Sequence, residues 1–150
     1  MSAPRWISAS AEVLTVGLPF CVFKGLTGLV MVAHHQAVWA GAVLLALAAI
    51  DIVFNVVNLL SLLAAHRRWT PTCLAQALWS LGHPRGHEIG LAIDVFVSFG
   101  LVAAMIATGA LRLLPSWGAT AWNVAVICNV LGAGVGRLFA AIKATRPRAY

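Results

Sequence analysis

The chain has 150 residues, of which 61% are hydrophobic and only 9% are charged. An ordinary soluble domain carries roughly 25% charged residues, so this composition excludes that class and is typical of an integral membrane protein. No linker or low-complexity tract divides the chain, and we interpret residues 1–150 as a single membrane domain of the all-α class. Of the three cysteines, Cys21 and Cys128 lie inside apolar runs as packing residues, and Cys73 is the candidate for a reactive thiol.

Four apolar windows follow one another along the chain. They cover residues 11–33, 37–64, 88–112 and 119–142, and each reaches the ~20 residues that a membrane-crossing helix needs. A signal peptide is not favoured at the basic start MSAPR, because Lys24 interrupts the apolar region that follows. The sequence therefore predicts a four-transmembrane-helix bundle.

The basic residues predict the orientation of these helices. Arg112 is expected on one side, and all the other basic residues near span ends are expected on the opposite side: Arg5, Arg67, Arg68, Arg85, Lys143, Arg146 and Arg148. Positive residues gather on the cytoplasmic side, so both termini are expected in the cytoplasm, at a bacterial-type inner (plasma) membrane. The net charge of +6 is then a topology signal and requires no nucleic-acid partner.

The loop between the second and third spans contains a helical pattern. In the stretch WTPTCLAQALWSLG, Thr72 is a candidate helix cap, and Leu74, Leu78 and Leu81 follow at helical spacing. We expect a short interfacial helix that lies on the cytoplasmic face of the membrane.

Polar residues inside the spans fall into two expected layers. The central layer lies within roughly 3 Å of the membrane midplane and the second roughly 10 Å toward the cytoplasm, by the rise of a helix. Lys24, Asp51 and Asn129 belong to the central layer, Asp94, Asn58 and Arg137 belong to the second, and Asn55 lies between them. All seven are candidate binding or transport residues, because an ionisable group at mid-bilayer costs about 2.5–3.5 kcal/mol or more.

A structural interpretation of the same residues stays open. Lys24 can neutralise Asp51, and Arg137 can neutralise Asp94, so each layer could be a buried ion pair that specifies which helices meet. The outer halves of the first three spans hold almost no strong polar group. The pattern therefore favours a pocket or half-channel open toward the cytoplasm over a continuous pore.

Other chemistry finds less support in the sequence. His66, His83 and His87 are weak metal candidates near the cytoplasmic edge, because Pro84 and Gly86 interrupt helical spacing there. The sequence shows no hydrolase, nucleotide-binding or zinc-protease motif, so we expect no cofactor and no catalytic residue, and an enzyme is not favoured.

Three functional hypotheses follow, in order of preference. The first is a small transport protein, dimeric and coupled to protons or cations, in which Asp51 is the responsive acid, Lys24 its counter-charge, and Asp94 with Arg137 the cytoplasmic gate. The second is a non-catalytic accessory subunit that stabilises a larger membrane complex. The third is a membrane enzyme acting on a lipid or quinone near Asp94 and Glu88. The expected partners are the lipid bilayer and either a second copy or a larger complex.

Overall fold

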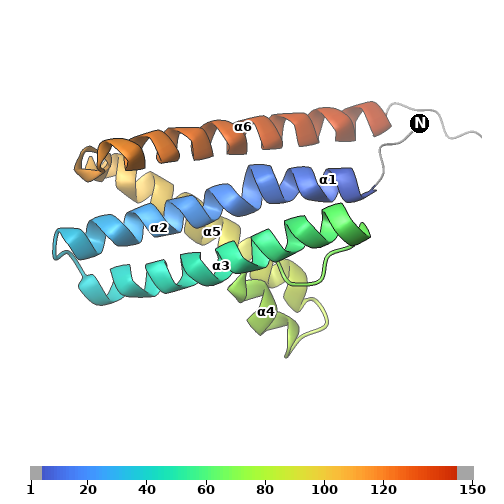
Figure 1. Ribbon diagram of the computed structural model, residues 1–150, viewed down its shortest axis with the longest axis horizontal. Coiled ribbons are helices and arrows are strands. Elements are labelled where there is room, and N and C mark those ends of the chain that lie inside the picture. The colour runs from blue at the N-terminus through green and yellow to red at the C-terminus, as the bar shows by residue number, and fades with distance from the viewer. Residues whose placement is uncertain (1–4, 145–150) are drawn as a thin grey trace, which may run out of the picture.

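The computed structural model describes the backbone of residues 5–144 and the side chains of residues 6–134. Within this part of the chain every regular element is helical, as Figure 1 shows, which confirms the all-α class. The elements are α1 (Arg5–Glu12), the π-helix η1 (Val13–Gly17), α2 (Leu18–Ala33), α3 (Val38–Ala65), α4 (Leu74–Ser80), α5 (Gly86–Ala107), the 3-10 helix η2 (Ala110–Leu113) and α6 (Ser116–Ala144).

Three helical segments are long and apolar enough to cross a membrane: Trp6–Ala33, Val38–Ala65 and Gly86–Ala107. They correspond to the first three predicted spans. The third ends at Ala107 and not at residue 112, because Gly109 adopts a left-handed conformation with φ 69° that stops the helix. The fourth predicted span falls in α6, which is not among these three, so a fourth crossing stays a prediction.

The first membrane-length segment is continuous but irregular, because it passes from α1 through η1 into α2. Pro19 near the start of α2 has no N–H, so the carbonyl of Thr15, four residues earlier, lacks its usual helical donor. The side chain of Asn129 in α6 takes that place, donating from Nδ2 to the Thr15 oxygen at 3.3 Å. Gly132, one turn further along α6, lies so close to Thr15 that a Cβ would collide with it. Asn129 therefore joins α6 to the irregular part of this segment.

The helix α2 lies between α3 and α6, and α5 crosses behind it (Figure 1). Its apolar face supplies most of the main core, which contains Phe20, Phe23, Leu26, Val30, Met105, Trp122 and Ala125. On its other side α2 approaches α3 at Gly28 and Gly41, where a Cβ added to Gly28 would lie 2.7 Å from the Gly41 carbonyl oxygen. Small residues at this crossing let the two backbones meet.

The chain turns back into the bundle after α3 ends. Asn58 Oδ1 accepts the N–H groups of Trp69 and Thr70 at 3.2 and 3.1 Å, and its Nδ2 donates to the Pro71 carbonyl at 3.0 Å. One turn deeper, Asn55 Nδ2 donates to the Thr72 carbonyl at 2.9 Å. We call residues 69–74 the re-entrant segment, because they run back along α3 from its end toward its middle.

The re-entrant segment ends beside Asp51, whose Oδ1 accepts the N–H of Leu74 at 2.7 Å. Asp51 lies in the middle of α3, about 21 Å of helix before Ala65. The helix α4 predicted from the sequence is present, and it begins beside the middle of α3; its place on the cytoplasmic face of the membrane stays a prediction. Thr72 does not cap this helix, since the Thr72 N–H and hydroxyl both donate to Gln76 Oε1.

The reason for this position lies in the non-helical backbone of the re-entrant segment, whose donors and acceptors need partners outside a helix. Non-helical backbone at membrane depth is tolerated only where protein groups or water satisfy its donors and acceptors. Asn58, Asn55 and Asp51 lie on one stripe of α3 and provide those partners. The hydrophobic spacing of α4 says nothing about such partners, so it indicates a helix without indicating its depth.

Replacement of Asn58 by Ala tests this arrangement. It removes the side-chain partner of three part-buried backbone groups, the N–H groups of Trp69 and Thr70 and the carbonyl of Pro71. A buried group left unpaired costs about 1–3 kcal/mol, and for these part-buried groups together we expect a loss of stability of about 2 kcal/mol. Burial also raises the pKa of the nearby Cys73 thiol to about 11, so at neutral pH it is almost entirely protonated and slow to react.

Release of the segment in Asn58→Ala should therefore speed maleimide labelling of Cys73, followed by mass spectrometry of the labelled peptide. Asn123→Ala is the matched control, because Asn123 is an exposed asparagine of α6. Equal labelling rates and melting temperatures for wild type and Asn58→Ala would show that the segment does not depend on Asn58.

Candidate functional site

A buried lysine joins three helices at the centre of the structure. Lys24 of α2 places Nζ 2.6 Å from Oδ2 of Asp51 in α3, and the same ammonium donates to Oδ1 of Asp94 in α5. The three side chains are 4%, 3% and 10% exposed. We call Lys24, Asp51 and Asp94 the ion triad.

The sequence predicted two separate ion pairs, and the ion triad contains one of them and changes the partner of the second acid. The predicted pairing of Lys24 with Asp51 is present. Asp94 was expected in a separate layer with Arg137, but it bonds to the same ammonium as Asp51. The reason is that α5 begins beside the inserted α4 and carries Asp94 near its own middle. Arg137 lies outside the residues whose side chains the structure describes, so its pairing stays a prediction.

The ion triad contains more acid than base. With all three groups ionised, one positive and two negative charges leave a net charge of −1 in a buried site. Burying an unbalanced charge is costly, so such a site favours binding of a proton or another cation. The other ion pair among the described side chains, Arg68 with Glu12 at 2.7 Å, is more exposed. Its glutamate lines the same cavity as Asp94.

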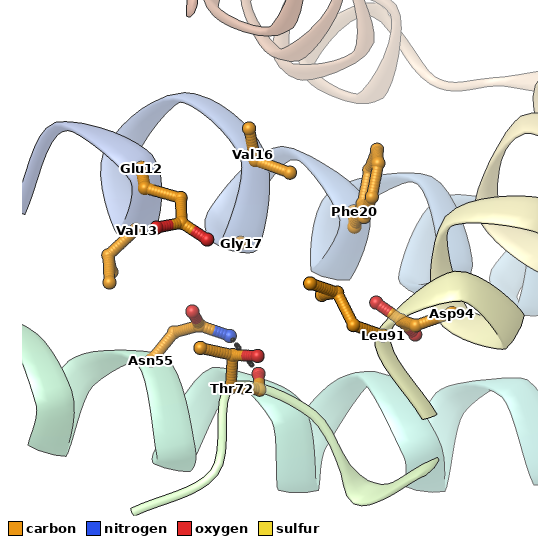
Figure 2. Close-up of a pocket in the computed structure, with 9 residues that line it drawn as sticks. All are labelled: Glu12, Val13, Val16, Gly17, Phe20, Asn55, Thr72, Leu91 and Asp94. Carbon is orange, nitrogen blue, oxygen red and sulfur yellow. Dashed lines mark hydrogen bonds between the residues drawn. The ribbon is translucent and has the colours of Figure 1, made fainter. Parts of the chain in front are cut away.

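A small cavity of about 20 Å³ leads to Asp94 (Figure 2). This is room for roughly one water molecule. Its lining residues are Glu12, Val13, Val16, Gly17, Phe20, Asn55, Thr72, Leu91 and Asp94. They come from α1, η1, α2, α3, the re-entrant segment and α5, so the cavity exists only because all of these elements meet.

Several buried polar atoms around the ion triad have no hydrogen-bond partner among the described side chains and backbone. Asn55 Oδ1 lines the cavity, Thr27 Oγ1 lies one turn after Lys24, and Ser98 Oγ lies one turn after Asp94. Unsatisfied polar atoms are rare in protein interiors, and an unplaced water or ion is a common explanation. Asn55 lines the same cavity as Asp94, so its unpaired oxygen favours a site there that holds water or a small cation.

The other candidate residues have identified contacts. Asn58 and Asn129 both bond to backbone, the first to the re-entrant segment and the second to Thr15. The three candidate metal ligands lie apart: His66 stacks on Trp6, His83 Nδ1 accepts from the Arg85 N–H at 3.1 Å, and His87 lies 2.9 Å from the Gln76 amide nitrogen. Among the described residues, no group of three or more ligating side chains is arranged to hold a metal ion.

Two polar residues of the site were not singled out from the sequence. Glu12 lines the cavity, and its only sequence signal is that it is one of just four acidic residues in the chain. Gln76 is fully buried, with Oε1 accepting from Thr72 and Nε2 facing His87. Because that nitrogen can only donate, the facing Nε2 of His87 acts as the acceptor. An amide in a predicted surface helix gives no indication of this burial.

Comparisons of the chain with protein-family models, with curated proteins and with solved structures find no match. The chemistry of the ion triad and its cavity is therefore the basis on which a function is inferred.

A stability measurement separates the contributions within the ion triad. Lys24→Met leaves two carboxylates buried without their counter-charge, and we expect it to lower the free energy of unfolding by about 3–5 kcal/mol. The triple variant Lys24→Met, Asp51→Asn, Asp94→Asn removes all three charges and should recover much of that loss. Unfolding of the purified protein in detergent, followed by circular dichroism, measures both effects. A Lys24→Met variant as stable as wild type would contradict a stabilising role of the ammonium.

Proposed function

We propose that this protein is a small membrane transport protein coupled to protons or cations, with the ion triad as its binding site. The observation that carries the proposal is the excess of acid in the triad, where one buried ammonium serves two carboxylates. A purely structural ion pair needs one acid for one base. The additional buried carboxylate is a cost to folding that binding of a proton or cation would offset.

The proposal includes the membrane topology expected from the sequence. In it, α6 forms a fourth span, both termini are cytoplasmic, and the membrane is of the bacterial inner type. The cavity lined by Glu12 and Asp94 then opens on the cytoplasmic side, because Glu12 lies in the first turns of the chain. Three helices of membrane length support membrane insertion itself.

Coupling would follow from the way in which the lysine is shared. When a proton or cation occupies one carboxylate, that carboxylate attracts the ammonium less, and Lys24 pairs more strongly with the other acid. Because Asp51 and Asp94 lie on different helices, this exchange changes the force that holds α5 to α2 and α3. Gly90 of α5 packs directly on the backbone at Gln76, so α4 would move together with α5.

A second candidate is a non-catalytic accessory subunit of a larger membrane complex. The exposed apolar faces of the outer helices favour it, since Phe96 of α5 is 79% exposed and no atom of the described residues lies within 4 Å of a Cβ added at Gly100. Such a face could equally pack against a second copy of this chain or against lipid. Purification in mild detergent separates the two functions: a larger subunit in fixed stoichiometry would support the accessory role, and a homodimer would support the transporter.

Transport is tested with the full chain in liposomes that carry a pH-sensitive dye inside. Under an imposed membrane potential we expect wild type to move protons, and both Asp94→Asn and Asp51→Asn to lower the rate by about tenfold or more, because each removes an acid of the triad. Thr120→Val is the control, since its exposed hydroxyl bonds only to its own helix. Wild-type liposomes no more permeable to protons than empty ones, across sodium and potassium gradients as well, would overturn the proposal.

A further inference from the structure

The two carboxylates of the ion triad have different surroundings. Asp51 uses both oxygens, with Oδ2 facing Lys24 Nζ and Oδ1 accepting the Leu74 N–H. Among the described residues, the one hydrogen bond to Asp94 comes from Lys24 Nζ and is accepted by Oδ1. A proton added to Asp51 would displace one of two donors and disturb the re-entrant segment. A proton added to Asp94 Oδ2 displaces none.

The cavity beside Asp94 contains a second polar atom without a partner. Asn55 is almost completely buried, and its Nδ2 donates to the carbonyls of Asp51 and Thr72. These two acceptors fix the orientation of the amide, so Oδ1 faces away from them, toward Gly17 and the Glu12 side of the cavity in Figure 2. An amide oxygen in that position needs a donor, and a water molecule fits a cavity of about 20 Å³.

The outer end of the cavity has an acid with access to solvent. Glu12 is 48% exposed and pairs with Arg68 at 2.7 Å. Its carboxylate faces the Asn55 oxygen across the cavity in Figure 2, while Asp94 lines the other end. A hydrated metal ion is larger than this space, whereas a proton passes through a single water.

We infer that Asp94 is the acid that exchanges its proton, an inference that rests on the proposed transport function. Asp94 does so through one water bound by Asn55 Oδ1, with Glu12 as the outer proton donor and acceptor. In the inward step the Glu12 O–H bond breaks, the water accepts that proton and passes one of its own on, and an O–H bond forms at Asp94 Oδ2. The triad changes from a net charge of −1 to zero, and Glu12 regains a proton from solvent.

Other titratable groups surround this route and set its charge. Asp94 is faced by Lys24 and Cys21 from α2, by Asp51 from α3 and by Cys73 at the start of α4. Glu12 is faced by Arg68. Asp51 and Asp94 compete for the Lys24 ammonium. The variant Asp51→Asn is therefore the one to compare with Asp94→Asn.

Infrared difference spectroscopy of the purified full chain in lipid tests which acid takes the proton, independently of transport. As pH falls, wild type should gain the carbonyl stretch of a buried protonated carboxylic acid. The band should disappear in Asp94→Asn and persist in Asp51→Asn, with circular dichroism checking that each variant is helical. A band that persists in Asp94→Asn and disappears in Asp51→Asn would overturn the inference, while liposome flux would still decide whether the protein transports.

The route through the cavity is tested by the rate at which this band shifts in deuterated water. A Cβ on Gly17 would collide with Asn55 Oδ1, so Gly17→Ala closes the cavity, and Glu12→Gln removes the outer acid. Both should slow the shift by about tenfold or more. Gly25→Ala on the same segment is the control, since its Cβ would lie 3.6 Å from that of Ala48, an ordinary contact.

Two results would contradict the route. Wild-type exchange rates in both Gly17→Ala and Glu12→Gln would show that protons reach Asp94 another way. Removal of the band at constant pH by sodium chloride, but not by choline chloride, would show that a sodium ion and not a proton occupies the site.

Discussion

The ammonium of Lys24 is the interaction on which the arrangement of the helices depends. It lies in the helix that contacts all three neighbouring long helices, and it bonds to one acid in α3 and to one in α5. In an apolar setting a charge cannot be left without a partner, so each of these helices must present its carboxylate at the level of the lysine. The same constraint that specifies the packing also concentrates ionisable groups at one point.

Asp51 links this charge cluster to the backbone of the re-entrant segment. One of its oxygens faces Lys24 and the other accepts the first N–H of α4. Asn55 and Asn58 continue the same stripe and satisfy the extended backbone between α3 and α4. Much of the polar content of α3 therefore serves to hold non-helical chain inside the bundle. The two acids of the triad therefore differ: Asp51 uses both oxygens in contacts that hold the structure, whereas Asp94 accepts through Oδ1 alone and lines the cavity.

The sequence interpretation succeeded where it depended on composition and local pattern. The all-α class, the first three membrane-length helices and the pairing of Lys24 with Asp51 are all present. It failed for the depth of Asp94, which was counted in residues from the predicted end of the third span. That count places Asp94 nearer the cytoplasm than Lys24, because it assumes that the loop before α5 stays at the membrane surface. The re-entrant segment breaks that assumption, and no periodicity in residues 69–82 indicates it.

By itself the sequence determined that this chain forms long apolar helices carrying a few costly polar residues, because hydrophobicity and helical spacing are properties of neighbouring residues. Only the tertiary structure decided which polar groups meet. Asp51 and Asp94 meet at Lys24 across three helices, Asn129 reaches a carbonyl that Pro19 leaves free, and Glu12 and Asp94 line one cavity although they are far apart along the chain. These contacts depend on how segments distant in sequence are oriented and on backbone groups that need partners, and neither is encoded in a local pattern.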